Sequence, residues 1–478
     1  MELIEACEYG LSAAEKMGAD QCESYASSDD VSIIGREMKR AETKNNLLEG
    51  ISFRVVSNNA VGFAYTSNLT KKDIKLAVKK AYEIAKSKGR DPHFKSLPEP
   101  KASTVKGIYD KKLAALEFDD IAEIFELIES SSRIHKALKP IFTSVIKVST
   151  QDVLMNSLGV NLGDKTTFFV AMLGILTTKG LTPNFYMDVM STRKCDFNPS
   201  EFGKQVGEEA LACSGPKTIN FKGKCDVILH PNALIGIPQG LMDLVMHQVK
   251  ASSLVEGKSL FKDKVDEEIA PPELTITDDG TLTNGLFTSS HDAEGVPRHK
   301  TTIIQKGILQ SFIYDTYYGN RFGKKSTGNS SRFKITDMAT YRTPPFIDST
   351  NIVVEKGDTN LEYLIGEIKE GFYVKSVMGT HTANKLTGDF SLPFSGFKIE
   401  NGKIKYPVMM TMVSGNIVNL LREVNGVTKE RKTTINMLTP WLKSKATINA
   451  TKFGMKIRAG LVLLKILTTL GIKKEFPM

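Results

Sequence analysis

The seven histidines are the residues of this chain that could bind a catalytic metal ion. A zinc-binding helix needs two imidazoles four residues apart, since positions i and i+4 project from the same side of a helix. Hydrolysis also needs a glutamate to accept a proton from the metal-bound water, and a third ligand from elsewhere. The closest histidines, His291 and His299, are eight residues apart, so no pair has this spacing. A zinc site would have to be assembled from distant histidines, which nothing in their local arrangement indicates.

Two other kinds of catalytic motif are also missing. No GxSxG turn presents a serine nucleophile. Cys225 precedes the apolar run DVILH, and because free cysteines are usually buried, we interpret it as a packing residue rather than a nucleophile. The segment GNRFGKKSTG (319–328) has glycines and a Lys-Ser pair, but it lacks the GxxxxGK[ST] spacing of a phosphate loop.

A block of acidic residues allows two interpretations. It consists of Asp278, Asp279, Asp292 and Glu294. The carboxylates could form a pair for metal binding or acid–base catalysis. Alternatively they occupy hairpin ends, where Asp side chains bond the local backbone. We favour the second interpretation, because a glycine and a proline follow Glu294 within three residues.

The first ninety residues have the pattern of a helix, an antiparallel sheet and a second helix. Apolar residues recur at helical spacing over 2–17. Strand-like runs follow, and Asn58-Asn59 between GISFRVV and AVGFAYT predicts a hairpin. Thr70 is placed to cap a helix that runs to about Lys88.

Two further units follow the polar, proline-bearing segment 90–100, which is typical of a linker. Helices are predicted near 118–138, 199–213 and 238–250, with strand-like runs between them. The predicted fold is α+β, with antiparallel and mixed sheets and packed helices. Its predicted parts are an N-terminal α+β domain over 1–98, a central α/β domain over 105–222, a larger β-rich C-terminal domain over 223–450, and a basic apolar tail over 451–478.

The clearest hairpin signal is FKIENGKIKYPV, because Asn-Gly favours a two-residue type I′ turn. With Asn401-Gly402 as the turn, the register pairs Glu400 with Lys403, Ile399 with Ile404 and Phe397 with Tyr406.

The net charge of +9 lies in the C-terminal end of the chain. Residues 431–478 hold ten Lys/Arg and one acidic residue, and the rest of the chain holds 53 basic and 53 acidic residues, so the body of the chain is neutral.

The five cysteines are scattered and form no CxxC pair, which is typical of a reducing compartment. The N-terminus lacks signal-peptide features and no apolar run is long enough to span a membrane. We therefore expect a cytoplasmic protein.

Three segments together resemble the TldD/PmbA family, whose members build a two-subunit zinc peptidase. They are DAEGVPRHKTTIIQKG (292–307), KSTGNSSR (325–332) and GTHTANKLTGDFSLPFSGFKIENGKIKYPV (379–408). In the family's catalytic TldD-type subunit, zinc is bound by an HExxxH helix and a cysteine near the C-terminus. The corresponding residues here, LVMHQV (244–249), contain only His247, and no cysteine follows Cys225. The chain therefore resembles the PmbA (TldE) type, the metal-free partner.

The resemblance implies a non-catalytic subunit of a cytosolic metallopeptidase that degrades or processes unfolded peptides. It implies a TldD-type partner in a heterodimer, or a homodimer, with zinc in the partner and no metal ligand or catalytic residue here. We expect the turn segments to line the peptide chamber or the subunit interface. The residues expected there are Asp292, Glu294, Arg298, Asn329 and Arg332.

Two alternatives stay open. One is a self-sufficient peptidase with a site of its own around Asp292 and Glu294. The other is a regulatory protein that binds a membrane or nucleic acid through its tail, since 452–470 has the pattern of a basic, apolar helix. Such a helix could equally pack on its own body or on a partner, with lysine stems at the border of the contact. Relatives end near the position of residue 450, so the tail is a departure from the family.

Overall fold

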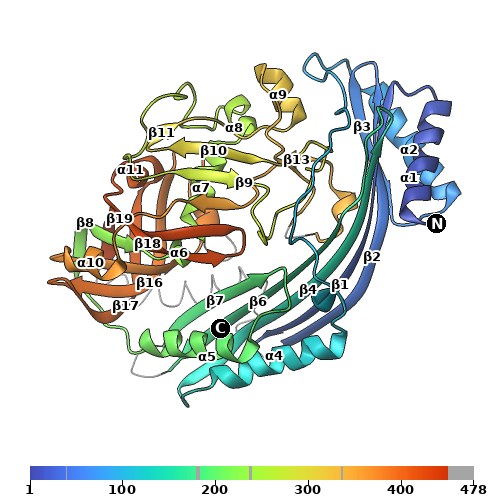
Figure 1. Cartoon of the computed structure of the whole chain (residues 1–478). Helices are drawn as coiled ribbons and strands as arrows, with labels where there is room; N and C mark the ends of the chain where they lie inside the picture. Colours follow the sequence, from blue (N-terminus) through green and yellow to red (C-terminus); the bar gives the residue numbers. More distant parts are fainter. Residues whose placement is uncertain (39, 179–182, 236–239, 335–336, 451–478) are drawn as a thin grey trace, which may run out of the picture.

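The computed structural model describes residues 1–38, 40–178, 183–235, 240–334 and 337–450. They form an N-terminal antiparallel sheet and a C-terminal mixed sheet, with helices packed on both. This confirms the predicted α+β fold and its β-rich C-terminal part. In Figure 1 the long strands of the N-terminal sheet curve around the C-terminal half of the chain. The predicted tail helix over 452–470 lies outside the described residues.

The N-terminal sheet has seven strands in the order β3-β2-β1-β4-β6-β7, with β5 beside β4. Asn58 and Asn59 both adopt positive φ, as the predicted hairpin between β2 and β3 requires. The strands are β1 (Gln21–Glu37), β2 (Arg40–Ser57), β3 (Ala60–Thr66), β4 (Leu138–Asn156), β5 (Asn161–Leu162), β6 (Lys165–Thr177) and β7 (Asn184–Thr192).

The helices of the first 212 residues cover the outer face of this sheet (Figure 1). Thr70 accepts a hydrogen bond from the backbone N–H of Asp73 at 3.1 Å, which is the predicted cap. The helices are α1 (Leu3–Lys16), α2 (Lys71–Ser87), α3 (Lys111–Ala114), α4 (Phe118–Ser132) and α5 (Pro199–Ala212). Alternate side chains of β1, such as Ala26 and Ile34, join the cores beneath the helices. The other set, which includes Glu23, faces the C-terminal half.

The sheet runs without interruption from the first predicted unit into the second. β1 pairs with β4 from Glu23 opposite Asn156 to Glu37 opposite Phe142. The linker at 90–100 therefore joins two parts of one sheet, while the division of the chain into domains stays a prediction.

The C-terminal sheet has ten strands in the order β11-β10-β9-β14-β19-β17-β16-β15-β8, and β18 lies beside β19. β8 also pairs with β19, so the last five strands of this path close into a ring. The strands are β8 (Phe221–Leu229), β9 (Ile276–Asp279), β10 (Lys300–Gln305), β11 (Ile308–Leu309), β14 (Ile352–Val354), β15 (Glu370–Val377), β16 (Asp389–Glu400), β17 (Lys403–Asn416), β18 (Gly426–Thr434) and β19 (Met437–Ala450).

Short elements surround this sheet. A two-stranded sheet is formed by β12 (Ser330–Ser331) and β13 (Phe346–Ile347). The helices are α6 (Pro231–Ile235), α7 (Leu241–Gln248), α8 (Ala251–Val255), α9 (Thr316–Phe322), α10 (Leu361–Gly366) and α11 (Ile417–Arg422), with 3-10 turns η1 (Thr340–Arg342) and η2 (Thr380–Thr382). A large apolar core joins α6, α7 and α11 to the inner strands.

Two local predictions were wrong. The helix expected over 118–138 ends at Ser132. There, Ser130, Ser131 and Ser132 donate their hydroxyls to carbonyls of the preceding turn, and such bonds compete with helix continuation.

The register of the Asn401-Gly402 hairpin also differs from the prediction. Glu400 lies opposite Lys403 and Ile399 opposite Ile404, as expected, but Lys398 rather than Phe397 lies opposite Tyr406. A bulge between Lys398 and Ile399 shifts the pairing by one residue.

None of the helices in the described parts of the chain is long and apolar enough to cross a membrane.

Candidate functional site

The five residues predicted from the sequence lie where the C-terminal half meets the inner face of the N-terminal sheet. Asp292, Glu294 and Arg298 belong to the loop between β9 and β10, Asn329 directly precedes β12, and Arg332 directly follows it. Asp292, Glu294, Asn329 and Arg332 are buried, and Arg298 is half-buried.

Glu294 and Arg332 meet two residues of the N-terminal sheet in a buried cluster of four charges. Arg54 on β2 donates to Glu294 Oε1 from Nη1 at 2.7 Å and to Glu23 Oε1 from Nε at 2.9 Å. Its Nη2 forms a second contact with Glu23, which makes that pair bidentate. Arg332 Nη2 donates to Glu23 Oε1 at 2.5 Å. We call these four residues, Glu23, Arg54, Glu294 and Arg332, the charge cluster.

The remaining contacts of Arg332 fix it from both halves of the chain. Its Nη1 donates to the carbonyl of Thr343 at 3.0 Å, and its guanidinium carbon lies 4.6 Å from the ring centroid of Tyr25 on β1. Nε has no partner among the described residues. Burial, the largest influence, lowers the pKa of Arg332.

The two carboxylates of the predicted acidic pair have different surroundings. Burial, the largest single influence, would raise the pKa of Glu294, but the charge of Arg54 and the hydrogen bonds from Arg54 and Thr316 together lower that pKa below its ordinary value. Among the described residues, the hydrogen bonds to the Asp292 carboxylate come from backbone N–H groups and not from a guanidinium. Burial, followed by the charge of Glu294, raises its pKa to about 7.

Asp292 acts on the backbone of its own turn. Its Oδ1 accepts from the N–H groups of Glu294 at 2.9 Å and Val296 at 3.0 Å, and its Oδ2 accepts from the N–H of Ser330 at 3.1 Å. These contacts fit the interpretation of the acidic block as turn chemistry. Asp292 thus ties the loop before β10 to strand β12.

Arg298 joins the loop before β10 to the segment around β12, and Asn329 joins that segment to β9. Arg298 donates to the carbonyls of Gly328 at 2.7 Å and Ser330 at 3.1 Å. Asn329 donates through Nδ2 to Asp278 Oδ1 at 3.0 Å. The structure therefore brings all five predicted residues into one network, although only Glu294 and Arg332 contact the N-terminal sheet.

The network is built to position loops. Glu23, Glu294 and Asp292 all accept hydrogen bonds from guanidinium or backbone N–H groups, so their oxygens are engaged within the chain. Removing one partner of such a buried pair typically costs about 3–5 kcal/mol. Sequence reasoning missed Glu23 and Arg54. The available signal was Arg54 itself, a charged residue inside the apolar strand GISFRVV.

Helix α7 contains the residues that the resemblance aligns with a zinc-binding helix. His247 is half-buried, and its Nε2 has no hydrogen-bond partner among the described residues. One turn earlier, Asp243 accepts from the N–H of Gly240 at 2.6 Å and so caps the helix. The described residues contain no group of three or more His, Cys, Asp or Glu that could hold a metal ion. The residues of α7 therefore do not fit a zinc site.

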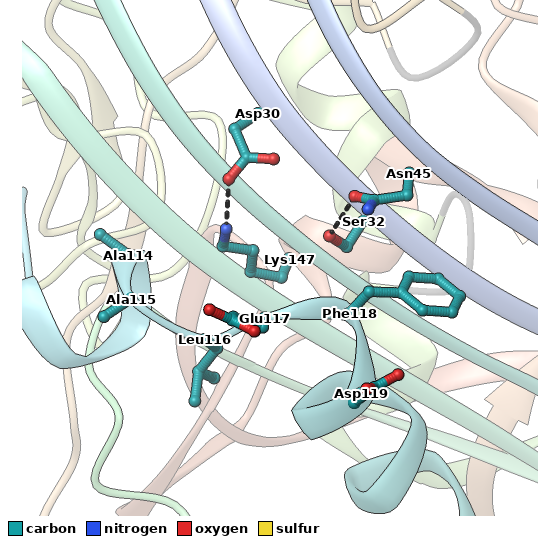
Figure 2. Close-up of a pocket in the computed structure, with 10 residues that line it drawn as sticks. All are labelled: Asp30, Ser32, Asn45, Ala114, Ala115, Leu116, Glu117, Phe118, Asp119 and Lys147. Carbon is teal, nitrogen blue, oxygen red and sulfur yellow. Dashed lines mark hydrogen bonds and ion pairs between the residues drawn. The ribbon is translucent and has the colours of Figure 1, made fainter.

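A cavity of about 400 Å³ opens on the outer face of the N-terminal sheet, away from these loops. Figure 2 shows Lys147 on β4 reaching Asp30 on β1, with Nζ and Oδ2 2.5 Å apart, above the segment that leads into α4. None of the five predicted residues lines it. The lining residues are Asp30, Ser32, Asn45, Ala114, Ala115, Leu116, Glu117, Phe118, Asp119 and Lys147.

Comparison with known families matches two parts of the chain to one family. Residues 222–449 match the PmbA/TldA metallopeptidase C-terminal domain, and residues 24–85 match PmbA/TldA metallopeptidase domain 1. The chain belongs to the PmbA/TldD family. The segment 292–332, which carries the five predicted residues, lies inside the first match.

Curated relatives of this PmbA/TldD chain cover most of its length. The metalloprotease PmbA of Escherichia coli O157:H7 is 24% identical over 444 residues, which cover 89% of this chain and 91% of the relative. A zinc metalloprotease TldD homolog of Saccharolobus solfataricus is 26% identical over 442 residues, covering 88% and 91%. Family membership thus supports a peptidase-related function.

The fold matches a solved structure. TldE from Thermococcus kodakarensis superposes with a TM-score of 0.81 at 22% identity, covering 93% of this chain and 100% of that one. At this identity the likeness concerns the fold.

Proposed function

We propose that this chain is the PmbA (TldE)-type, non-catalytic subunit of a two-subunit zinc peptidase in the cytoplasm. The observation that carries the proposal is helix α7, where LVMHQV (244–249) supplies one histidine, and no cysteine follows Cys225 in the sequence. A single imidazole leaves most of the coordination sphere of zinc unfilled. The metal and the general base would then come from a TldD-type partner with an HExxxH helix.

The alternative of a self-sufficient site at Asp292 and Glu294 has less support. Both side chains are only 4% exposed. Glu294 is paired with Arg54 at 2.7 Å, and Asp292 accepts three backbone hydrogen bonds. A carboxylate that activates water needs a free oxygen within reach of substrate.

We assign the five predicted residues a positioning role in the assembled peptidase. Asp292, Glu294, Asn329 and Arg332 hold the loops around β12, and the half-buried Arg298 is the member with surface left for a partner or a peptide. The substrate in this proposal is an unfolded peptide, which a groove between subunits recognises through its backbone.

The decisive experiment is reconstitution. The chain, the TldD-type partner and their mixture are assayed for cleavage of an unfolded peptide, and zinc is measured by elemental analysis in each. We expect zinc in the partner, less than one-tenth zinc per chain in this protein, and full activity only in the mixture. Peptidase activity of the isolated chain, or one zinc per chain, would refute the proposal.

A further inference from the structure

The outer edge of β2 between Arg40 and Leu47 has no strand beside it in the described parts of the chain. β1 pairs with β2 along 40–56. On the other side, β3 reaches only from Ser57 to Ile51. All residues over 40–47 are exposed.

The pairing fixes which backbone groups point outward along this edge. Met38 donates its N–H to Ile141 of β4 at 2.6 Å, so the even-numbered residues at this end of β1 face β4 and the odd-numbered ones face β2. Opposite the odd residues of β1 lie the even residues of β2. The odd residues of β2 therefore direct N–H and C=O away from β1. In the exposed stretch these are Ala41, Thr43, Asn45 and Leu47.

Of the features that usually prevent pairing with another chain, this edge has charged side chains but not the others. Proteins protect sheet edges with prolines, bulges or very short strands. The stretch over 40–47 contains no proline, its pairing with β1 has no register shift, and Leu47 is 67% exposed. Its protection consists of charges on the inner face, Glu42 and Lys44, whose side chains pair with each other at 2.5 Å.

We propose that this edge pairs with the same edge of a second copy of the chain, antiparallel across a two-fold axis at Thr43. The charges select both the partner and the register. With Thr43 opposite Thr43 of the second copy, Glu42 of each copy lies opposite Lys44 of the other. Both opposite-charge pairs occupy non-hydrogen-bonded positions, where side chains are closest.

Neighbouring registers are disfavoured by the same charges. Moving the register by two residues in one direction places Glu42 opposite Glu42, and in the other direction places Lys44 opposite Lys44. Like charges directly opposite each other destabilise a strand pair. Moving the register by a single residue places the odd residues of one copy, whose N–H and C=O groups point outward, opposite even residues of the other copy, whose N–H and C=O groups point toward β1. Thr43 is thus the position at which identical edges complement each other.

The contact is small and so its affinity is modest. An edge of this length buries less than the roughly 1,000 Å² of a stable interface, so we expect reversible association in the micromolar range. It requires no catalytic partner and is independent of the proposed peptidase function. An unrelated extended peptide would lack the reciprocal charges, and its binding would leave the chain monomeric.

Sedimentation velocity of the full chain from about 1 to about 200 µM tests the proposal through charge exchange. E42K and K44E alone should each weaken self-association about tenfold or more, because two attractive pairs become repulsive. An equimolar mixture of E42K and K44E should recover the wild-type dimer, as should the double variant E42K/K44E. The control is Lys79→Glu on α2, an exposed lysine far from this edge in sequence. A monomeric wild-type chain, or a dimer unaffected by K44E, would overturn the proposal.

Disulfide trapping tests the register. Thr43→Cys should cross-link to itself, since hydrogen-bonded pairs have Cα atoms about 5.5 Å apart, within disulfide range. A41C and N45C should cross-link only when mixed, because each lies about 14 Å from its own copy. E83C on α2 should stay uncross-linked. Equal cross-linking of A41C alone and of T43C would refute the two-fold at Thr43 even if the protein is dimeric.

Discussion

Replacing Arg54 with methionine tests whether the charge cluster joins the two halves of the molecule. Methionine keeps most of the side-chain length and removes the guanidinium. Arg54 is only 9% exposed and contacts both Glu23 and Glu294. Arg332 still pairs with Glu23 at 2.5 Å, so Glu294 is the carboxylate that loses its cation. The variant therefore leaves one buried charge on the C-terminal side without a cation, held by the backbone N–H of Thr316 at 2.9 Å.

The expected loss of stability is about 3–5 kcal/mol, the usual result of breaking a buried ion pair from one side. Adding E294Q to Arg54→Met should recover about half of that loss or more, because a neutral amide carries a much smaller desolvation cost and Arg332 keeps Glu23 as its partner. The control Lys79→Met breaks an exposed pair with Glu83 at 3.6 Å and should cost less than about 0.5 kcal/mol.

Urea unfolding at neutral pH measures these differences with two probes. Far-ultraviolet circular dichroism follows both sheets, and the single tryptophan, Trp441 on β19, reports on the C-terminal half. If the cluster couples the halves, we expect the two transitions to coincide in the wild type and to separate in Arg54→Met. A loss below about 1 kcal/mol, or no recovery in the double variant R54M/E294Q, would refute the reasoning.

Three further outcomes are expected. Asp29 is 2% exposed, and burial raises its pKa to about 6. Because the folded state binds the proton of Asp29 more tightly than the unfolded state, the contribution of Asp29 to the free energy of unfolding falls as pH rises from about 4 to about 6. D29N should remove that slope in urea titrations at a series of pH values. A Cβ added at Gly62 would lie 1.9 Å from the carbonyl of Ala81 on α2, so G62A should cost more than about 2 kcal/mol, whereas G366A meets nothing within 4 Å and should be neutral in the same titration. H247A should leave both zinc content and the activity of the reconstituted mixture unchanged, and a loss of either would assign a metal role to α7.

Local signals in the sequence predicted much of the fold. The cap at Thr70 and the asparagine pair at Asn58-Asn59 act within a few residues, and the structure has both. The bulge beside Lys398 was missed, because the pairing of β16 is also set by β15, which pairs with the opposite side of β16. Register in a sheet depends on both neighbours, and a hairpin pattern contains only one of them.

The same limit applies to the charge cluster. The sequence pointed to Glu294 and Arg332 through their turn-rich surroundings, but their partners Glu23 and Arg54 are 240 residues or more away. A single amino-acid sequence contains no periodic pattern that links positions so far apart. A charged residue within an apolar strand pattern still indicates that the side chain has a partner of opposite charge, although the pattern does not identify that partner.

The closure of the C-terminal ring has a consequence for the order in which the chain acquires its structure during synthesis. Strand β8 is complete at Leu229, but one of its neighbours, β19, ends only at Ala450. The N-terminal sheet, by contrast, has all its strands once Thr192 has left the ribosome. A nascent chain therefore spends the translation of more than two hundred residues with an assembled first sheet and an open second one. During that interval the edge of β8 that later receives β19 is available to chaperones.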